Sequence, residues 1–117
     1  MKILDRIFAW LLLLLGCIHC VAAFLVHKTL TLDVIWFVSG GLAQIFGALL
    51  NLVRAARPED RLVVRVSLLA NLLLFAVFAI AVPWLLRNDI RQNPQVIALG
   101  VAVAAELFFS LKLSLAK

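Results

Sequence analysis

Residues 39–51, SGGLAQIFGALLN, combine glycine, alanine and amide side chains inside a long apolar segment. Two sets of residues in this stretch recur at helical spacing: Ser39, Ala43 and Gly47 every four residues, and Gly41, Gln44, Ala48 and Asn51 at three-four-three. Each set lies along a face of an α-helix. Small residues let neighbouring helices approach closely in a bilayer. The stretch therefore predicts a closely packed transmembrane helix, whose packing residues are Ser39, Gly40, Gly41, Ala43 and Gly47.

The composition of the whole chain extends this prediction to a membrane fold. Of 117 residues, 66% are hydrophobic and 15% charged, and the mean hydropathy is +1.15. A soluble domain of this size needs more polar surface. Four apolar segments, 7–26, 32–53, 62–86 and 95–115, are each long enough to cross about 30 Å of hydrocarbon. We expect a single all-α integral membrane domain over 1–117, an antiparallel up-down bundle of four transmembrane helices with short loops.

Positive charges flank the apolar segments and predict their orientation. Lys2, Arg6, Arg54, Arg57, Arg61, Arg65, Lys112 and Lys117 fall on one side, and Lys28, Arg87 and Arg91 on the other. The positive-inside rule then places both termini in the cytoplasm, and we expect a bacterial inner (plasma) membrane. Despite a net charge of +5, the sequence has no basic tail or patch interleaved with aromatic residues. Nucleic acid is therefore excluded as a partner.

Each apolar segment carries a strongly polar side chain away from its ends: His19, Gln44, Asn71 and Glu106. Such groups are costly in lipid and usually face the interior of a bundle. Ser67 lies one turn from Asn71, and a stripe of small and polar residues (Ala98, Ala102, Glu106, Ser110) follows the last segment. The four polar residues are candidates for a ligand or proton site, led by Glu106. The competing interpretation is that they form interhelical hydrogen bonds worth about 1 kcal/mol each.

Cysteine and histidine residues in the first segment are candidates for a redox centre or a metal site. Cys17 and Cys20 form a CxxC, and this pair on a four-helix protein resembles membrane disulfide-generating quinone reductases and vitamin K epoxide reductases. Those enzymes use a second cysteine pair, whereas this chain has two cysteines in all. Its two histidines, His19 and His27, are eight residues apart on one helix, about 12 Å, too far to share an ion. No metal or other cofactor is expected.

Three function classes remain open. The first is a non-catalytic accessory, assembly or interaction subunit, working in the bilayer as a homo-oligomer or with another membrane protein. The second is a small-molecule or proton-coupled binding or transport protein that uses Glu106. In size and helix number the chain resembles the small multidrug resistance transporters, which are dimers. Those transporters have an essential glutamate in the first span, whereas Glu106 lies in the fourth. A membrane redox or lipid/quinone enzyme is third; the sequence shows no catalytic triad or paired carboxylates.

Overall fold

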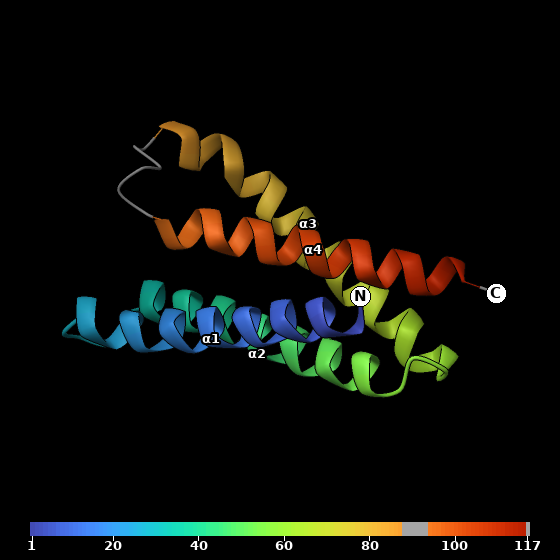
Figure 1. Cartoon of the computed structure of the whole chain (residues 1–117). Helices are drawn as coiled ribbons and strands as arrows, with labels where there is room; N and C mark the ends of the chain where they lie inside the picture. Colours follow the sequence, from blue (N-terminus) through green and yellow to red (C-terminus); the bar gives the residue numbers. More distant parts are fainter. Residues whose placement is uncertain (88–93, 117) are drawn as a thin grey trace.

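Four helices account for nearly all of the residues, 1–87 and 94–116, that the computed structural model describes (Figure 1). They are α1 (Lys2–Val26), α2 (Leu32–Ala56), α3 (Arg61–Arg87) and α4 (Pro94–Leu115). Each is long and apolar enough to cross a membrane, α3 over its part Arg61–Ala81. The predicted all-helical fold with four candidate spans is confirmed, and these spans indicate an integral membrane protein.

Each helix extends beyond the apolar segment that predicted it, α3 and α4 by one residue at an end and α1 and α2 by several residues. Helix α1 begins at Lys2 rather than at residue 7, and α2 continues to Ala56 rather than stopping at residue 53. Backbone hydrogen bonding does not depend on side-chain polarity, so a helix continues through charged residues until a turn ends it. Asp5 and Arg54 are therefore helical. Of the flanking charges counted above, Arg91 and Lys117 lie outside the described residues.

The connection between α2 and α3 ends in a side-chain cap. The Asp60 carboxylate accepts hydrogen bonds from the backbone N–H groups of Leu62 (3.0 Å) and Val63 (3.2 Å). Aspartate at this position satisfies donors that the first turn of a helix leaves unpaired. Pro58, two residues earlier, lies in the turn that ends α2. The short connection of residues 57–60 therefore fixes where α3 begins.

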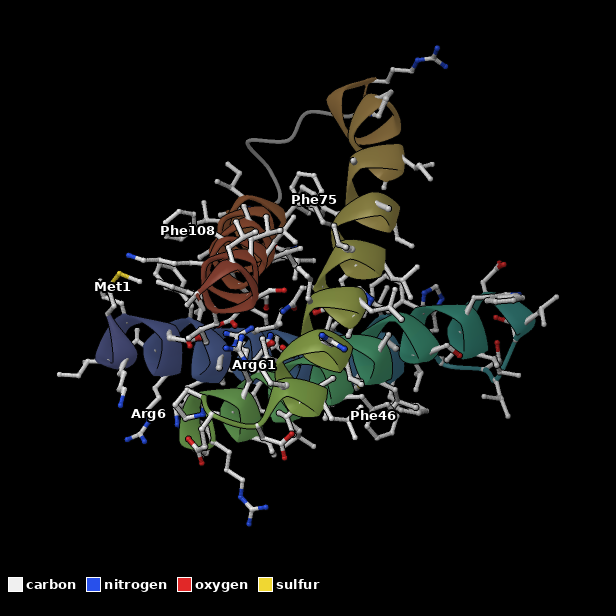
Figure 2. The ribbon with its side chains drawn as sticks, turned by 90° about the vertical axis from the view of Figure 1, so that its right-hand side faces the viewer. Met1, Arg6, Phe46, Arg61, Phe75 and Phe108 are labelled. Atoms are coloured by element: carbon white, nitrogen blue, oxygen red, sulfur yellow. The ribbon has the colours of Figure 1, made fainter. Side chains whose placement is uncertain are left out.

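The helices associate as two pairs. Helix α1 packs along α2, helix α3 packs along α4, and the pairs meet through α1 with α4 and α2 with α3. Helix α3 begins beside the end of α2 and then runs away from it towards the junction with α4 (Figure 1). Figure 2, turned by 90°, shows the same divergence, with α3 rising away from α2. The two pairs therefore meet closely near the chain termini and open apart towards the other end.

Glycine brings the backbones of α1 and α2 into contact. A methyl group placed on Gly16 would lie 3.0 Å from the carbonyl oxygen of Gly41, and one placed on Gly41 would lie 3.0 Å from that of Gly16. Neither oxygen can move without moving its helix. The crossing therefore requires residues without a side chain at both positions, as expected for close helix contact in a membrane protein.

Few apolar side chains are fully buried, and many large ones lie outside. One cluster of buried apolar residues consists of Leu12, Ala48, Ala102 and Val103. Leu14, Phe24, Phe46 and Ile80 are among the large apolar residues that are exposed. A surface of this kind would aggregate in water and is appropriate to contact with lipid. Polar residues are buried instead, and they define the sites below.

Candidate functional sites: a buried ionic network and an apolar pocket

Arg54 lies at the centre of a buried network to which every helix contributes. Its side chain is fully buried on α2. Nη2 forms ion pairs with the Asp5 carboxylate of α1 and, at 2.8 Å, with Glu106 Oε2 of α4. Two carboxylates on one guanidinium nitrogen, away from water, form a strongly coupled ionic unit. It joins the α1–α2 pair to the α3–α4 pair.

Amides and hydroxyls complete the network. Arg54 Nη1 donates to Asn51 Oδ1 (2.9 Å), to Ser67 Oγ (3.0 Å) and to the Ser110 hydroxyl. Asn51 and Asn71 exchange hydrogen bonds between their side-chain amides, at 3.0 and 2.8 Å, and so join α2 to α3. Asn71 Nδ2 also donates to Ser110 Oγ at 2.7 Å, which joins α3 to α4. Buried polar groups that satisfy one another in this way specify a single arrangement of the helices.

Only two buried atoms of the network lack a hydrogen-bond partner within the described residues, Arg54 Nε and Glu106 Oε1. None of the network residues lines the larger pocket of the molecule. Asp5 lines a small cavity of about 150 Å³ between the ends of the chain, beside Met1 and Lys112. Nearly all buried polar atoms of the network are thus hydrogen-bonded. The network connects the helices and leaves little room for a ligand.

The larger pocket lies where the two helix pairs diverge. Its volume is about 620 Å³, and all four helices contribute to its lining, for example His19 of α1, Gln44 of α2, Phe78 of α3 and Leu99 of α4. His19 and Gln44 are its only side chains with polar groups among the described residues. Pockets of this size and apolar character, with a few polar groups, are typical of small-molecule sites.

The Gln44 amide is the exceptional group in this pocket. The residue is only 8% exposed. Within residues 1–87 and 94–116, nothing forms a hydrogen bond with its side chain. An amide in apolar surroundings without a partner costs about 1–3 kcal/mol. The Gln44 amide is not among the atoms sealed away from the surface, so the pocket lining offers it as an unused hydrogen-bonding group.

His19 lies on the same wall of the pocket. Its ring stacks on Phe37 of α2, with 3.9 Å between ring centroids and 6° between ring planes. A methyl group on Gly40 would be 3.6 Å from His19 Nε2, so this nitrogen approaches α2 at Gly40. Gly40 is one helical turn before Gln44. The imidazole and the amide are thus held about one turn apart by two neighbouring helices.

The four polar candidates from the sequence divide between these two sites. Glu106 and Asn71 belong to the network, where Asn71 Nδ2 also approaches the Glu106 backbone oxygen at 3.4 Å. Gln44 and His19 line the pocket instead. Asn51 is the residue of the glycine-rich stretch that joins the network, through Asn71.

The packing candidates on α2 also divide. Gly41 and Gly47 are buried, Gly41 against α1 and Gly47 close to Leu74 of α3. Ser39, Gly40 and Ala43 are exposed, and the Ser39 hydroxyl donates to the Ile35 carbonyl of its own helix at 2.7 Å. Small residues therefore serve two faces of α2, one buried against other helices and one that is exposed, where Gly40 and Ala43 also line the pocket.

The two thiols of the CxxC have different surroundings. Both cysteines are free; Cys17 is exposed and Cys20 is half-buried. Cys20 Sγ donates a weak hydrogen bond to the Val38 carbonyl at 3.7 Å and packs against Gly41. Within the described residues, no three His, Cys, Asp or Glu side chains gather as metal ligands would.

Sequence reasoning missed Arg54, the ion-pair partner of Glu106, and Asp5, the second carboxylate paired with Arg54. It counted Arg54 with the flanking charges and left Asp5 outside the first span, but both are buried and ion-paired. The helical spacing of Asp5 and Arg54 could have indicated that both residues are buried. Asp5 continues the buried face of Ala9, Leu12 and Gly16, and Arg54 lies three residues after Asn51 on the same face.

Over the described residues, fold and sites define a small, all-helical protein with four candidate membrane spans, a buried ionic network and a lateral apolar pocket. No known protein family matches the chain, and no curated protein or solved structure is significantly similar to it. Functional inference therefore depends on the two sites.

Proposed function

We propose that this chain is a membrane-embedded binding protein that holds an apolar, membrane-dissolved small molecule between its two helix pairs. In this proposal the helices form an antiparallel up-down bundle in a bacterial inner membrane, with both termini in the cytoplasm. The observation that carries the proposal is the pocket of about 620 Å³ containing the unpaired Gln44 amide. Without a ligand in this space, the amide would face only lipid tails, which offer it no hydrogen-bond partner.

The network supports this function indirectly. Because Arg54, Asp5 and Glu106 join the helix pairs at one end, α3 can diverge from α2 at the other end without loss of the fold. Glu106 and Asn71 are already engaged by other side chains and do not line the pocket. We therefore assign these two residues to positioning of the helices, and the pocket to binding.

Native mass spectrometry in lipid nanodiscs tests the proposal, with a pocket variant and a matched control. Ala43 lines the pocket and is exposed, so Ala43→Trp fills space without displacing the core. Leu42 is its exposed neighbour and does not line the pocket, so Leu42→Trp adds a similar bulk elsewhere. We expect a retained small molecule in the native protein and in Leu42→Trp, and its loss in Ala43→Trp. Equal retention by all three proteins, or by none, contradicts the proposal.

An interaction subunit is the second candidate, and the exposed small residues Ser39, Gly40 and Ala43 favour it. Such a face allows close approach of another transmembrane helix, from a second copy or a different protein. The same mass spectra distinguish an interaction subunit from a ligand-binding protein, because a bound partner chain appears as an added protein mass. Loss of that mass in Ser39→Leu, with the pocket ligand absent throughout, would favour the interaction function over ligand binding.

A further inference from the structure

The polar groups of the pocket restrict the chemistry of its ligand. The Gln44 side chain offers an N–H₂ donor and a carbonyl acceptor. Neutral imidazole has a single N–H donor, and the His19 ring already has the Phe37 backbone as a hydrogen-bond partner. Apart from His19, the described residues place no titratable side chain in the lining. A charged group there would find no counter-ion among the described lining residues and would be disfavoured. An uncharged headgroup therefore fits this lining best.

The Gln44 amide favours a hydrogen-bond acceptor on the ligand. The stacking of His19 on Phe37 fixes its ring, and Gln44 lies one turn beyond the point where that ring approaches α2. The rest of the lining is hydrocarbon, with Val77 and Phe78 of α3 and Leu99 of α4 among it. Such a pocket matches a hydrocarbon tail that ends in a headgroup with a carbonyl oxygen.

We infer that the pocket binds a lipid-like molecule with an uncharged headgroup that contains carbonyl oxygens, one of which accepts a hydrogen bond from the Gln44 amide. The inference rests on the proposed binding function and specifies its ligand class. Two kinds of membrane molecule have this chemistry: a quinone with an aliphatic tail, and a diacylglycerol with two ester carbonyls. They share the acceptors and differ in the shape of the headgroup.

Three probes separate these possibilities: 2-decyl-1,4-benzoquinone, dioctanoylglycerol and decylbenzene, which has a tail and a ring but no carbonyl. Each is titrated into the full chain in nanodiscs of saturated phosphatidylcholine, and the bound fraction is measured by native mass spectrometry. We expect at least one carbonyl probe to bind about tenfold more tightly than decylbenzene, the contribution of one good hydrogen bond. Preference for the quinone or for the diacylglycerol identifies the source.

One substitution removes the donor and a second is its control, and both keep the shape of the pocket. Gln44→Leu removes the amide, and His19→Phe keeps an aromatic ring against Phe37. Gln44→Leu should reduce the preference for the carbonyl probe about tenfold, with binding of decylbenzene retained, and His19→Phe should leave that preference unchanged. The ligand-free Gln44→Leu protein should also unfold at a higher temperature than the native protein, because an unpaired amide is replaced by an apolar side chain.

The same chemical change in the network provides the matched control. Asn71→Leu removes an amide that is paired with Asn51 and Ser110, so this variant should unfold at a lower temperature. A lower unfolding temperature for Gln44→Leu as well would give Gln44 a structural role and overturn the inference. Equal binding of decylbenzene and both carbonyl probes would also overturn it, while leaving the proposed function intact. If no probe binds and no native lipid is retained, the proposed function itself fails.

Discussion

At the scale of single residues, the balance of charge around Arg54 decides which substitutions the protein tolerates. One guanidinium faces the carboxylates of Asp5 and Glu106, and all three groups are buried. Loss of one acid leaves a neutral pair, whereas loss of the base leaves two carboxylates without a counter-charge. The cost of a buried, unpaired charge greatly exceeds that of a missing hydrogen bond.

Arg54→Leu should therefore destabilise the protein by about 3–5 kcal/mol, the usual loss when a buried ion pair is broken. Glu106→Gln should cost only about 1 kcal/mol, since its amide oxygen can still accept from Arg54 Nη2. Unfolding in mixed micelles of increasing denaturing detergent measures both.

A triple variant, Asp5→Asn, Arg54→Leu and Glu106→Gln, provides the control for this prediction. It removes every charge from the network and should recover much of the stability that Arg54→Leu loses. If Arg54→Leu alone were as stable as the native protein, the network could not be the joint between the helix pairs.

At the scale of the helices, the closest packing is the crossing of α1 and α2, where glycine backbones touch. Gly41→Ala should destabilise the protein by about 1–3 kcal/mol, because the added methyl group would meet the Gly16 carbonyl oxygen at 3.0 Å and Cys20 Sγ at 2.5 Å. Gly40→Ala is the matched control one residue earlier. Its methyl group would have only His19 Nε2 near it, at 3.6 Å, so stability should be unchanged or slightly higher. Thermal unfolding in the same detergent compares them, and equal losses would contradict the crossing geometry.

The start of α3 depends on a single capping side chain. Asp60→Ala should cost about 1 kcal/mol, because the backbone N–H groups of Leu62 and Val63 lose their acceptor. Asp60→Asn keeps an acceptor oxygen at the same position and should retain most of the stability. A similar loss in both variants would show that charge, rather than the hydrogen bonds, stabilises this end of the helix.

At the scale of the whole molecule, the two helix pairs are joined at one end and diverge at the other (Figure 1). Binding in the pocket should therefore change distances at the open end only. Spin labels at the exposed positions Trp36 of α2 and Ile97 of α4 report on the open end, and labels at Val53 and Leu111 report on the network end. In a cysteine-free background, electron–electron double resonance should show a narrower Trp36–Ile97 distribution with ligand and an unchanged Val53–Leu111 distribution. Movement at both ends would instead indicate a loose bundle.

Orientation in the membrane is a property of the whole chain. Because Arg54 is buried, it cannot act as an exposed flanking charge, yet seven positive residues remain on the side of the termini against three on the other. A C-terminal fluorescent-protein fusion should therefore fluoresce, and a C-terminal alkaline phosphatase fusion should be inactive. The opposite pair of results would reverse the proposed orientation.

Helical periodicity predicted a substantial part of the buried surface. The set Gly41, Gln44, Ala48 and Asn51 is buried as its spacing indicates, and so are Ala102, Glu106 and Ser110 of the last helix. Periodicity works here because each helix has one inward face, which recurs every three or four residues. It could not separate Gln44 from Asn51, which lie on the same face but belong to the pocket and to the network.

The sequence by itself determined the number of helices, their candidate membrane spans and much of their inward faces. These properties are local, since the length and spacing of apolar residues along one helix are sufficient to specify them. Only the tertiary structure decided that Arg54 pairs with Glu106, 52 residues away, and that α3 diverges from α2 to leave a pocket around Gln44. Those features depend on the rotation and tilt of each helix against the others, which close contacts such as Gly16 with Gly41 set in three dimensions.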